Sequence, residues 1–320
     1  IVELIDSHDG FNIITEKIKN RDKRRLLWVI GFLTFVLSAI LDNLTTTIVI
    51  ISLLRKIMKD EKERLYFAGI VIIAANAGGA WSPIGDVTTT MLWIGGQITA
   101  FKIISKLILP SLVCLIVPLL FVSFRMKGNV ERPDDIRTNG NALPILQQKI
   151  ILFSGIAVLI SVPVFKTLTG LPPYMGILLG LGIIWIITEV IHRSKDDEEK
   201  RAYSVVNALR KIDTSTILFF LGILIAISAM QSTGILTMLS DSLAKSINNQ
   251  SVIVISIGLI SSVVDNVPLV AAAQGMYDLV QYPTDHYFWE FLAYCAGTGG
   301  SALIIGSAAG VAAMGMERIN

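Results

Sequence analysis

An Asp-Asn pair occurs twice in strongly apolar sequence, as Asp42-Asn43 and as Asp265-Asn266. An ionisable residue within a membrane segment is energetically costly, and a functional site is its default interpretation. Two such sites in corresponding positions of two half-chains are typical of transporters with internal repeats. The pattern therefore predicts that membrane-buried carboxylates bind a small cation or a proton.

A glycine-rich segment follows each Asp-Asn pair at nearly the same spacing. Gly78-Gly79 comes 36 residues after Asp42, and Gly299-Gly300 comes 34 residues after Asp265. The glycines and Pro83 disfavour an unbroken helix, and a break leaves backbone carbonyls that suit cations and amides that suit anions. We expect two broken helices, with close helix packing as the alternative explanation for the glycines.

The polar residues around the pairs and breaks carry carboxylate, amide and hydroxyl oxygens, which suit a small hard cation. No Lys or Arg occurs inside either apolar hairpin segment or either break. The candidate cation- or proton-binding residues are Asp42, Asn43, Thr45, Thr46, Asn76, Gly78, Gly79, Ser82, Asp86, Thr88, Asp265, Asn266, Thr298, Gly299 and Ser301. Our hypothesis places Na⁺ at Asp42, Asn43, Asn76 and Asp86, with Glu3 and Asp6 as accessory candidates.

A carboxylate in a low-dielectric site favours its protonated form when no metal ion is present, so one aspartate can carry Na⁺ one way and H⁺ the other. The first break contains Asp86, whereas the second contains no acid, so the first site is the better candidate for exchange. The alternative interpretation is that Asp42, Asp86 and Asp265 cap helices and that the neighbouring threonines bond to the helix backbone.

The composition indicates an all-α polytopic membrane protein. The 320-residue chain is 53% hydrophobic and 16% charged, against roughly 45–50% and 25% in soluble domains. Several apolar runs approach the ~20 residues that cross a bilayer as a helix. A net charge of +2 is too small to suggest a nucleic-acid partner, and the two cysteines and three histidines have no metal-ligand spacing. We expect no cofactor.

The basic residues predict how the first Asp-Asn segment lies in the membrane. They flank both ends of the apolar stretch 26–54, which places both ends in the cytoplasm. Two equal halves of about 14 residues would each reach only about 21 Å, short of the ~30 Å hydrocarbon core. We therefore expect a re-entrant hairpin with Asp42-Asn43 at its tip. The flanks of the stretch 252–276 carry no excess of basic residues, so this stretch should enter from the opposite side.

The predicted organisation is two inverted repeats joined by a cytoplasmic linker. Residues 1–124 hold a hairpin (26–54), a broken helix (65–97) and a span (102–124); the linker is 125–149; residues 150–320 hold spans (150–165, 174–191, 214–231), a hairpin (252–276) and a broken helix (290–315). Because the first two spans of the second repeat and the last span of the first have no counterparts, we expect N- and C-terminal spans of the complete transporter to be missing.

Four segments resemble the NhaD-type sodium/proton antiporters of the ion transporter superfamily: Leu41–Thr47, Asn76–Trp93, Val264–Val270 and Gly297–Ser301. The resemblance implies a two-hairpin, inverted-repeat fold shared with sodium-coupled dicarboxylate transporters. It also implies exchange of Na⁺ or Li⁺ for H⁺ in pH and salt homeostasis, a lipid bilayer around the chain, and a homodimer. The implied location is a bacterial inner membrane, with a chloroplast envelope as the alternative.

Two rival functions share some of these features. A sodium-coupled anion transporter would use the same hairpins, but three aspartates at mid-depth disfavour an anionic substrate. An intramembrane aspartyl protease needs two acids at one water molecule, and the Asn-paired aspartates lack that context. The sequence therefore predicts a transporter and not an enzyme.

Overall fold

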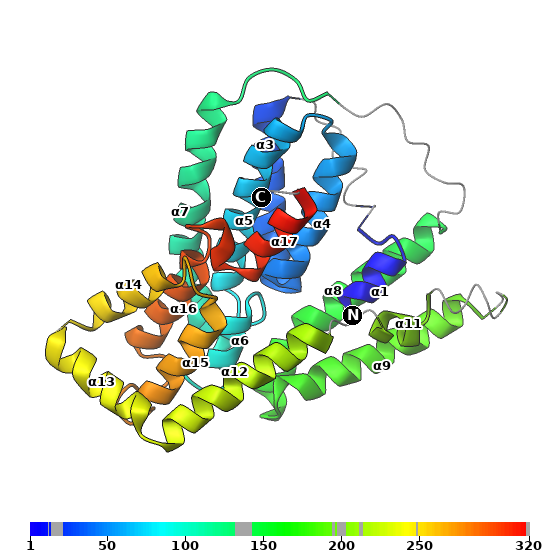
Figure 1. The fold of residues 1–320 in the computed structure, drawn as a ribbon. Coiled ribbons are helices and arrows are strands. Elements are labelled where there is room, and N and C mark those ends of the chain that lie inside the picture. The colour runs from blue at the N-terminus through cyan, green and yellow to red at the C-terminus, as the bar shows by residue number, and fades with distance from the viewer. Residues whose placement is uncertain are drawn as a thin grey trace. The chain divides into compact units, whose positions relative to one another are not determined.

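The computed structural model describes residues 1–11, 13, 22–131, 143–193, 196, 203–210, 214–247 and 249–317. The named elements in these ranges are all helices, and the only isolated β-bridge found there joins Asp22 to Asn129. In chain order (Figure 1) they are α1 (Val2–Ser7), α3 (Lys23–Leu41), α4 (Asn43–Ile57), α5 (Glu61–Ala80), α6 (Val87–Ile94), α7 (Ala100–Arg125), α8 (Ile145–Thr169), α9 (Pro173–Ile191), α11 (Val205–Arg210), α12 (Thr214–Ser232), α13 (Ile235–Ser246), α14 (Gln250–Ile260), α15 (Asn266–Met276), α16 (Tyr287–Gly299), η1 (Ile304–Gly306) and α17 (Ala308–Glu317). The all-helical prediction agrees with these elements.

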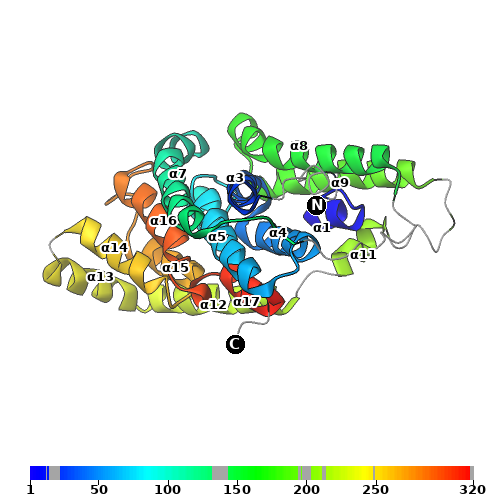
Figure 2. The same ribbon diagram turned by 90° about the horizontal axis from the view of Figure 1, so that it is seen from above.

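The chain forms two compact units. One contains residues 1–20 and 133–214, and the other contains residues 21–132 and 215–320. In the first unit α8 and α9 lie side by side, and α1 packs against α8 and α11 (Figure 2). The second unit contains both Asp-Asn pairs and both glycine-rich segments. A compact unit need not be a sequence repeat, so these two units do not test the predicted division of the chain into two repeats, which stays a prediction.

Several helices are suited to a bilayer. Among the described residues α3, α7, α8 and α9 are long and apolar enough to cross a membrane, and a further pair, Leu221–Ser232 and Ile235–Leu243, is bent by 77°. Less than a third of the most apolar window is buried within the protein for α7, α8 and α9. Their exposed apolar side chains need lipid or another protein around them. The chain is thus an integral membrane protein.

The predicted hairpin segment 26–54 forms two helices that meet at Asp42, but the assumption of equal halves is wrong. Helix α3 has 19 residues and begins at Lys23, because the side chain of Asp22 caps it by accepting from the Arg25 amide. At ~1.5 Å per residue it is about 28 Å long, close to the thickness of the hydrocarbon core. The 15 residues of α4 reach only about 22 Å. The length argument for a re-entrant hairpin therefore applies to α4 alone, and the hairpin stays a prediction.

The remaining predicted segments coincide with helices or helix breaks. The stretch 65–97 covers most of α5, a break at 81–86 and all of α6. The stretch 252–276 covers most of α14, a break at 261–265 and all of α15, and 290–315 covers most of α16, the turn around η1 and most of α17. The predicted spans 102–124, 150–165, 174–191 and 214–231 fall on α7, α8, α9 and α12. Helix interruptions thus occur within these segments, while their arrangement as hairpins and repeats stays a prediction.

One side-chain contact recurs in the two halves of the second unit. The Ser38 hydroxyl donates to the Ala75 carbonyl at 2.6 Å, and the Ser261 hydroxyl donates to the Ala296 carbonyl at 2.9 Å. Each serine stands four residues before the aspartate of its Asp-Asn pair. Helix α3 is thereby fixed to α5 in the same way as α14 is fixed to α16.

A close backbone approach recurs between the same helix pairs. A Cβ on Gly78 would collide with the Phe35 carbonyl of α3, and a Cβ on Gly299 would collide with the Gly258 carbonyl of α14. Phe35 and Gly258 each stand seven residues before the aspartate of their pair. Glycine is required here because the two backbones pack with no room for a side chain.

Candidate functional site

Asp86 lies in the break between α5 and α6, where it receives hydrogen bonds from both halves of the second unit. Its Oδ1 accepts from the amide and the hydroxyl of Thr88 at 2.9 and 3.0 Å, and so caps α6. Its Oδ2 accepts from Asn43 Nδ2 at 3.1 Å and from Asn266 Nδ2 at 3.4 Å. The residue is only 2% exposed. The asparagines of the two Asp-Asn pairs therefore meet at one buried carboxylate.

A chain of amides extends this site towards α17. Asn43 Nδ2 also donates to Asn76 Oδ1 at 3.0 Å, and Asn76 Nδ2 donates to Ser307 Oγ at 3.0 Å. Ser307 Oγ accepts from the Gly310 amide at 3.2 Å and so caps the first turn of α17. Asn76 is fully buried on α5. The structure thus joins Asn43, Asn76, Asp86 and Asn266, four of the predicted site residues, into one network.

Asp42 and Asp265 stand at the two helix junctions that carry the asparagines. Asp42 has a positive φ of 90° and accepts from the amide and the hydroxyl of Thr45 at 2.7 and 2.8 Å. The capping interpretation therefore describes Asp42 and Asp86 correctly. Asp42 and Asp265 directly precede Asn43 and Asn266, the two residues that donate to Asp86 Oδ2.

The electrostatics of this site call for a cation or a proton. In the part of the chain that the structure describes, none of the three aspartates forms an ion pair with lysine or arginine. A buried carboxylate is costly unless another charge or a proton balances it. The buried hydroxyls of Thr46 and Thr47, on the same helix as Asn43, have no hydrogen-bond partner among the described residues. Chemically, the arrangement can hold a small cation or a proton.

The other predicted residues hold the breaks in shape. Ser82 Oγ donates to the Ala39 carbonyl at 2.6 Å, whereas Thr298 and Ser301 donate to carbonyls of their own segment, Tyr294 O and Thr298 O, both at 2.6 Å. Gly78, Gly79 and Gly299 all serve close backbone packing. A ligand role for these residues stays a prediction. Glu3 and Asp6 lie on α1, in the unit that does not contain Asp86, and their accessory role also stays a prediction.

Two residues of the site were missed by the sequence prediction. Ser307 stands seven residues after Gly300, as Asp86 stands seven after Gly79. The repeat spacing could therefore have identified it. Gly297 packs against this site, because a Cβ there would lie 3.6 Å from Asp86 Oδ2. No spacing distinguishes Gly297 from its neighbouring small residues.

Apolar spanning helices, paired helix breaks and a buried carboxylate between them define a membrane transporter. The chain matches the sequence model of the CitMHS family, described as citrate transporter, over residues 1–297, and it belongs to that family. It is 51% identical over 322 residues to sodium/proton antiporter 1 of Arabidopsis thaliana, covering 100% of this chain and 55% of that protein. It is 50% identical to sodium/proton antiporter 2 of the same plant, covering 100% of this chain and 76% of that protein.

The bacterial relatives are more distant. Na⁺/H⁺ antiporter NhaD of Alkalimonas amylolytica is 32% identical over 319 residues, covering 92% of this chain and 64% of that protein. The predicted resemblance to NhaD-type antiporters is confirmed. The chain spans about half to three quarters of the length of these three relatives.

Proposed function

We propose that the protein containing this chain exchanges Na⁺ or Li⁺ for H⁺ across a membrane by alternating access. The observation that carries the proposal is the position of Asp86, which is 2% exposed and bonded to the asparagines of both Asp-Asn pairs. The names of the similar plant and bacterial proteins support the same activity. These names and the family description indicate a transporter, not an enzyme.

In this proposal Na⁺ and H⁺ compete for the same carboxylate. Na⁺ binds Asp86 Oδ2 and Asn76 Oδ1, the two oxygens to which Asn43 Nδ2 donates. Asp42 and Asp265 stand at the adjoining helix ends. Protonation of Asp86 removes the charge that holds the cation. Because neither ion binds well while the other is bound, the site carries one of them at a time. Exchange follows when the site changes sides only while it is occupied.

Alternating access needs elements that move around the site. The matched contacts of α3 with α5 and of α14 with α16 support two equivalent repeats. We propose that these pairs belong to the inverted repeats and that the breaks at 81–86, after α5, and at 300–307, after α16, are their hinges. The predicted homodimer in a lipid bilayer belongs to the same proposal.

The specific membrane is also part of the proposal. Sequence resemblance favoured a bacterial inner membrane over a chloroplast envelope. The plant relatives are 50 and 51% identical and the bacterial one 32%. The higher identity to the plant proteins supports the alternative location, a chloroplast envelope.

A sodium-coupled anion transporter is the second candidate, because the matching family is described as citrate transporter. Helix N-termini are the usual anion sites of such a fold. Here Asp42, Asp86 and Asp265 already stand at the N-termini of α4, α6 and α15. Three of the available helix ends therefore carry negative charge, which opposes an anionic substrate.

Vesicle assays separate the two candidates. The full-length protein is reconstituted with a pH-sensitive dye inside, and Na⁺ is added with or without citrate. We expect Na⁺ alone to drive proton flux, and we expect Asp86→Asn to abolish it while exposed Asp241→Asn on α13 leaves it unchanged. Proton flux that requires citrate, or citrate uptake driven by Na⁺, would establish the anion transporter instead.

A further inference from the structure

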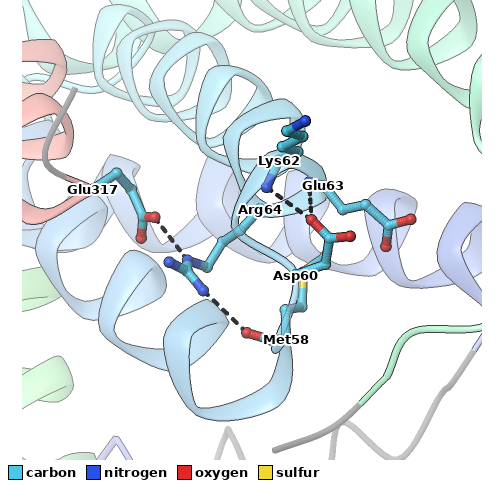
Figure 3. A network of polar contacts seen from close by, with 6 residues as sticks. All are labelled: Met58, Asp60, Lys62, Glu63, Arg64 and Glu317. Carbon is cyan, nitrogen blue, oxygen red and sulfur yellow. Dashed lines mark hydrogen bonds and ion pairs between the residues drawn. The ribbon is translucent and has the colours of Figure 1, made fainter. Parts of the chain in front are cut away.

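A buried ion pair joins the last turn of α17 to the first turn of α5 (Figure 3). Arg64 Nε donates to Glu317 Oε2 at 2.7 Å, and Arg64 Nη1 donates to the Met58 carbonyl at the end of α4 at 3.1 Å. The side chains are 10% and 1% exposed. One guanidinium therefore connects three helices.

The same two helices share a second polar contact at their other ends. Near the end of α5, Asn76 donates to Ser307, which caps the start of α17. Helix α17 thus runs antiparallel to α5, and Figures 1 and 2 show it beside α4 and α5. The contacts are 12 residues apart on α5 and 10 apart on α17, about 18 and 15 Å at ~1.5 Å per residue. Two contacts this far apart fix the position of α17 along α5.

Sliding matters because Ser307 determines which end of the Asn76 amide faces the site. While Ser307 accepts from Asn76 Nδ2, the amide oxygen is turned towards Asn43 Nδ2. If Ser307 moves away, the amide loses the partner that orients it. A rotated amide presents an NH₂ group, which a cation does not bind.

We propose that Arg64 and Glu317 are a positioning pair for the ion site: they fix the register of α17 so that Ser307 orients the Asn76 amide. The proposal rests on the proposed Na⁺/H⁺ exchange. Buried ion pairs contribute little net stability compared with apolar replacements, and setting register is their best-attested role. The pair itself contacts neither the cation nor Asp86.

Transport kinetics of the full-length protein in liposomes test the coupling. We expect Glu317→Gln to raise the apparent KM for Na⁺ about tenfold, within the range of coupled residues, with a smaller change in kcat. Ser307→Ala should do the same, and the double variant should be little worse than either single one because both act through α17. The exchanged pair Arg64→Glu with Glu317→Arg should recover part of the affinity.

The control is the ion pair between Lys23 and Glu63, which is more exposed and joins α3 to α5. Glu63→Gln should leave the Na⁺ KM within about twofold of the wild type, because this pair touches neither α17 nor the residues of the site. Two results would refute the positioning role. The first is a wild-type KM for Na⁺ both in the single variant Glu317→Gln and in the double variant Arg64→Gln/Glu317→Gln. The second is a double variant Glu317→Gln/Ser307→Ala whose rise in KM equals the product of the two single rises, because the two residues would then act independently.

Hydrogen exchange provides a readout that does not depend on transport. In the neutral double variant, Arg64→Gln with Glu317→Gln, amides at 307–311 should exchange faster although they lie a full helix away from the substitutions. Unchanged protection there would overturn the proposal even if transport fell. The two proposals can also fail separately. If hydrogen exchange at 307–311 is faster in the double variant but the wild type shows no Na⁺-driven proton flux, Arg64 and Glu317 position α17 and the proposed function is wrong.

Discussion

Asn43 and Asn266 donate to the same oxygen, Asp86 Oδ2, from helices that begin at two separate Asp-Asn pairs. The corresponding position of the second break is Ser307, which has no charge. The two halves of the second unit therefore contribute similar amides but only one acid to the centre of the site. This asymmetry makes Asp86 the residue on which both proposed substrates depend.

Asp86→Asn should abolish exchange while preserving membrane insertion. The substitution keeps the size of the side chain but removes the charge that balances a cation and the group that accepts a proton. We expect a loss of at least about 100-fold, because loss of outer-shell partners alone typically reduces metal affinity 10- to 100-fold. Na⁺-dependent proton flux in proteoliposomes measures it, and residual exchange above about a hundredth of the wild-type rate contradicts it.

Asn43→Ala should raise the Na⁺ KM more than Asn266→Ala does. Asn43 donates to both Asn76 and Asp86, at 3.0 and 3.1 Å, whereas Asn266 reaches only Asp86, at 3.4 Å. Loss of one partner from a buried polar network costs about 1–3 kcal/mol, or roughly 5- to 150-fold in affinity. Flux measured against Na⁺ concentration gives both constants, and an equal or reversed order contradicts the unequal roles.

The sequence marked the helix breaks and singled out most of the residues that form this network, because residue types and breaks are local signals. Asp-Asn pairs, paired glycines and Pro83 mark interruptions wherever the chain folds as helices. Which oxygen each asparagine reaches depends on how α3, α5, α14 and α16 pack, and no local signal contains that information. The sequence therefore grouped Asn76 with Asp86 but could not show that Asn266 reaches the same carboxylate.

The length of α3 was misjudged for a different reason. The prediction began the apolar stretch at Leu26, where hydrophobicity starts, but the helix starts at Lys23 after its cap, Asp22. A helix begins where its free amides find an acceptor, not where its apolar residues begin. The partnership of Arg64 with Glu317 is also tertiary, because the two residues are 253 positions apart.

The apparent KM for Na⁺ should rise as the pH falls. If H⁺ and Na⁺ compete for Asp86, each proton bound removes one free site, so lower pH favours the protonated form and weakens Na⁺ binding. For one-to-one competition the KM rises by up to about tenfold per pH unit, while the maximal rate at saturating Na⁺ stays constant. Initial rates at several pH values measure this, and a KM that is independent of pH contradicts shared binding.

Gly78→Ala should destabilise the second unit, whereas Gly69→Ala on the same helix should not. A Cβ on Gly78 would collide with the Phe35 carbonyl, but a Cβ on Gly69 meets nothing within 4 Å. Overpacking of this kind costs about 1–3 kcal/mol, while alanine for glycine in an unobstructed helix gains roughly 0.5–1 kcal/mol. Thermal denaturation in detergent, followed by size-exclusion chromatography, should show a lower midpoint for Gly78→Ala and an equal or higher one for Gly69→Ala. Equal midpoints for the two variants would mean that α3 and α5 do not approach as closely as their backbones indicate.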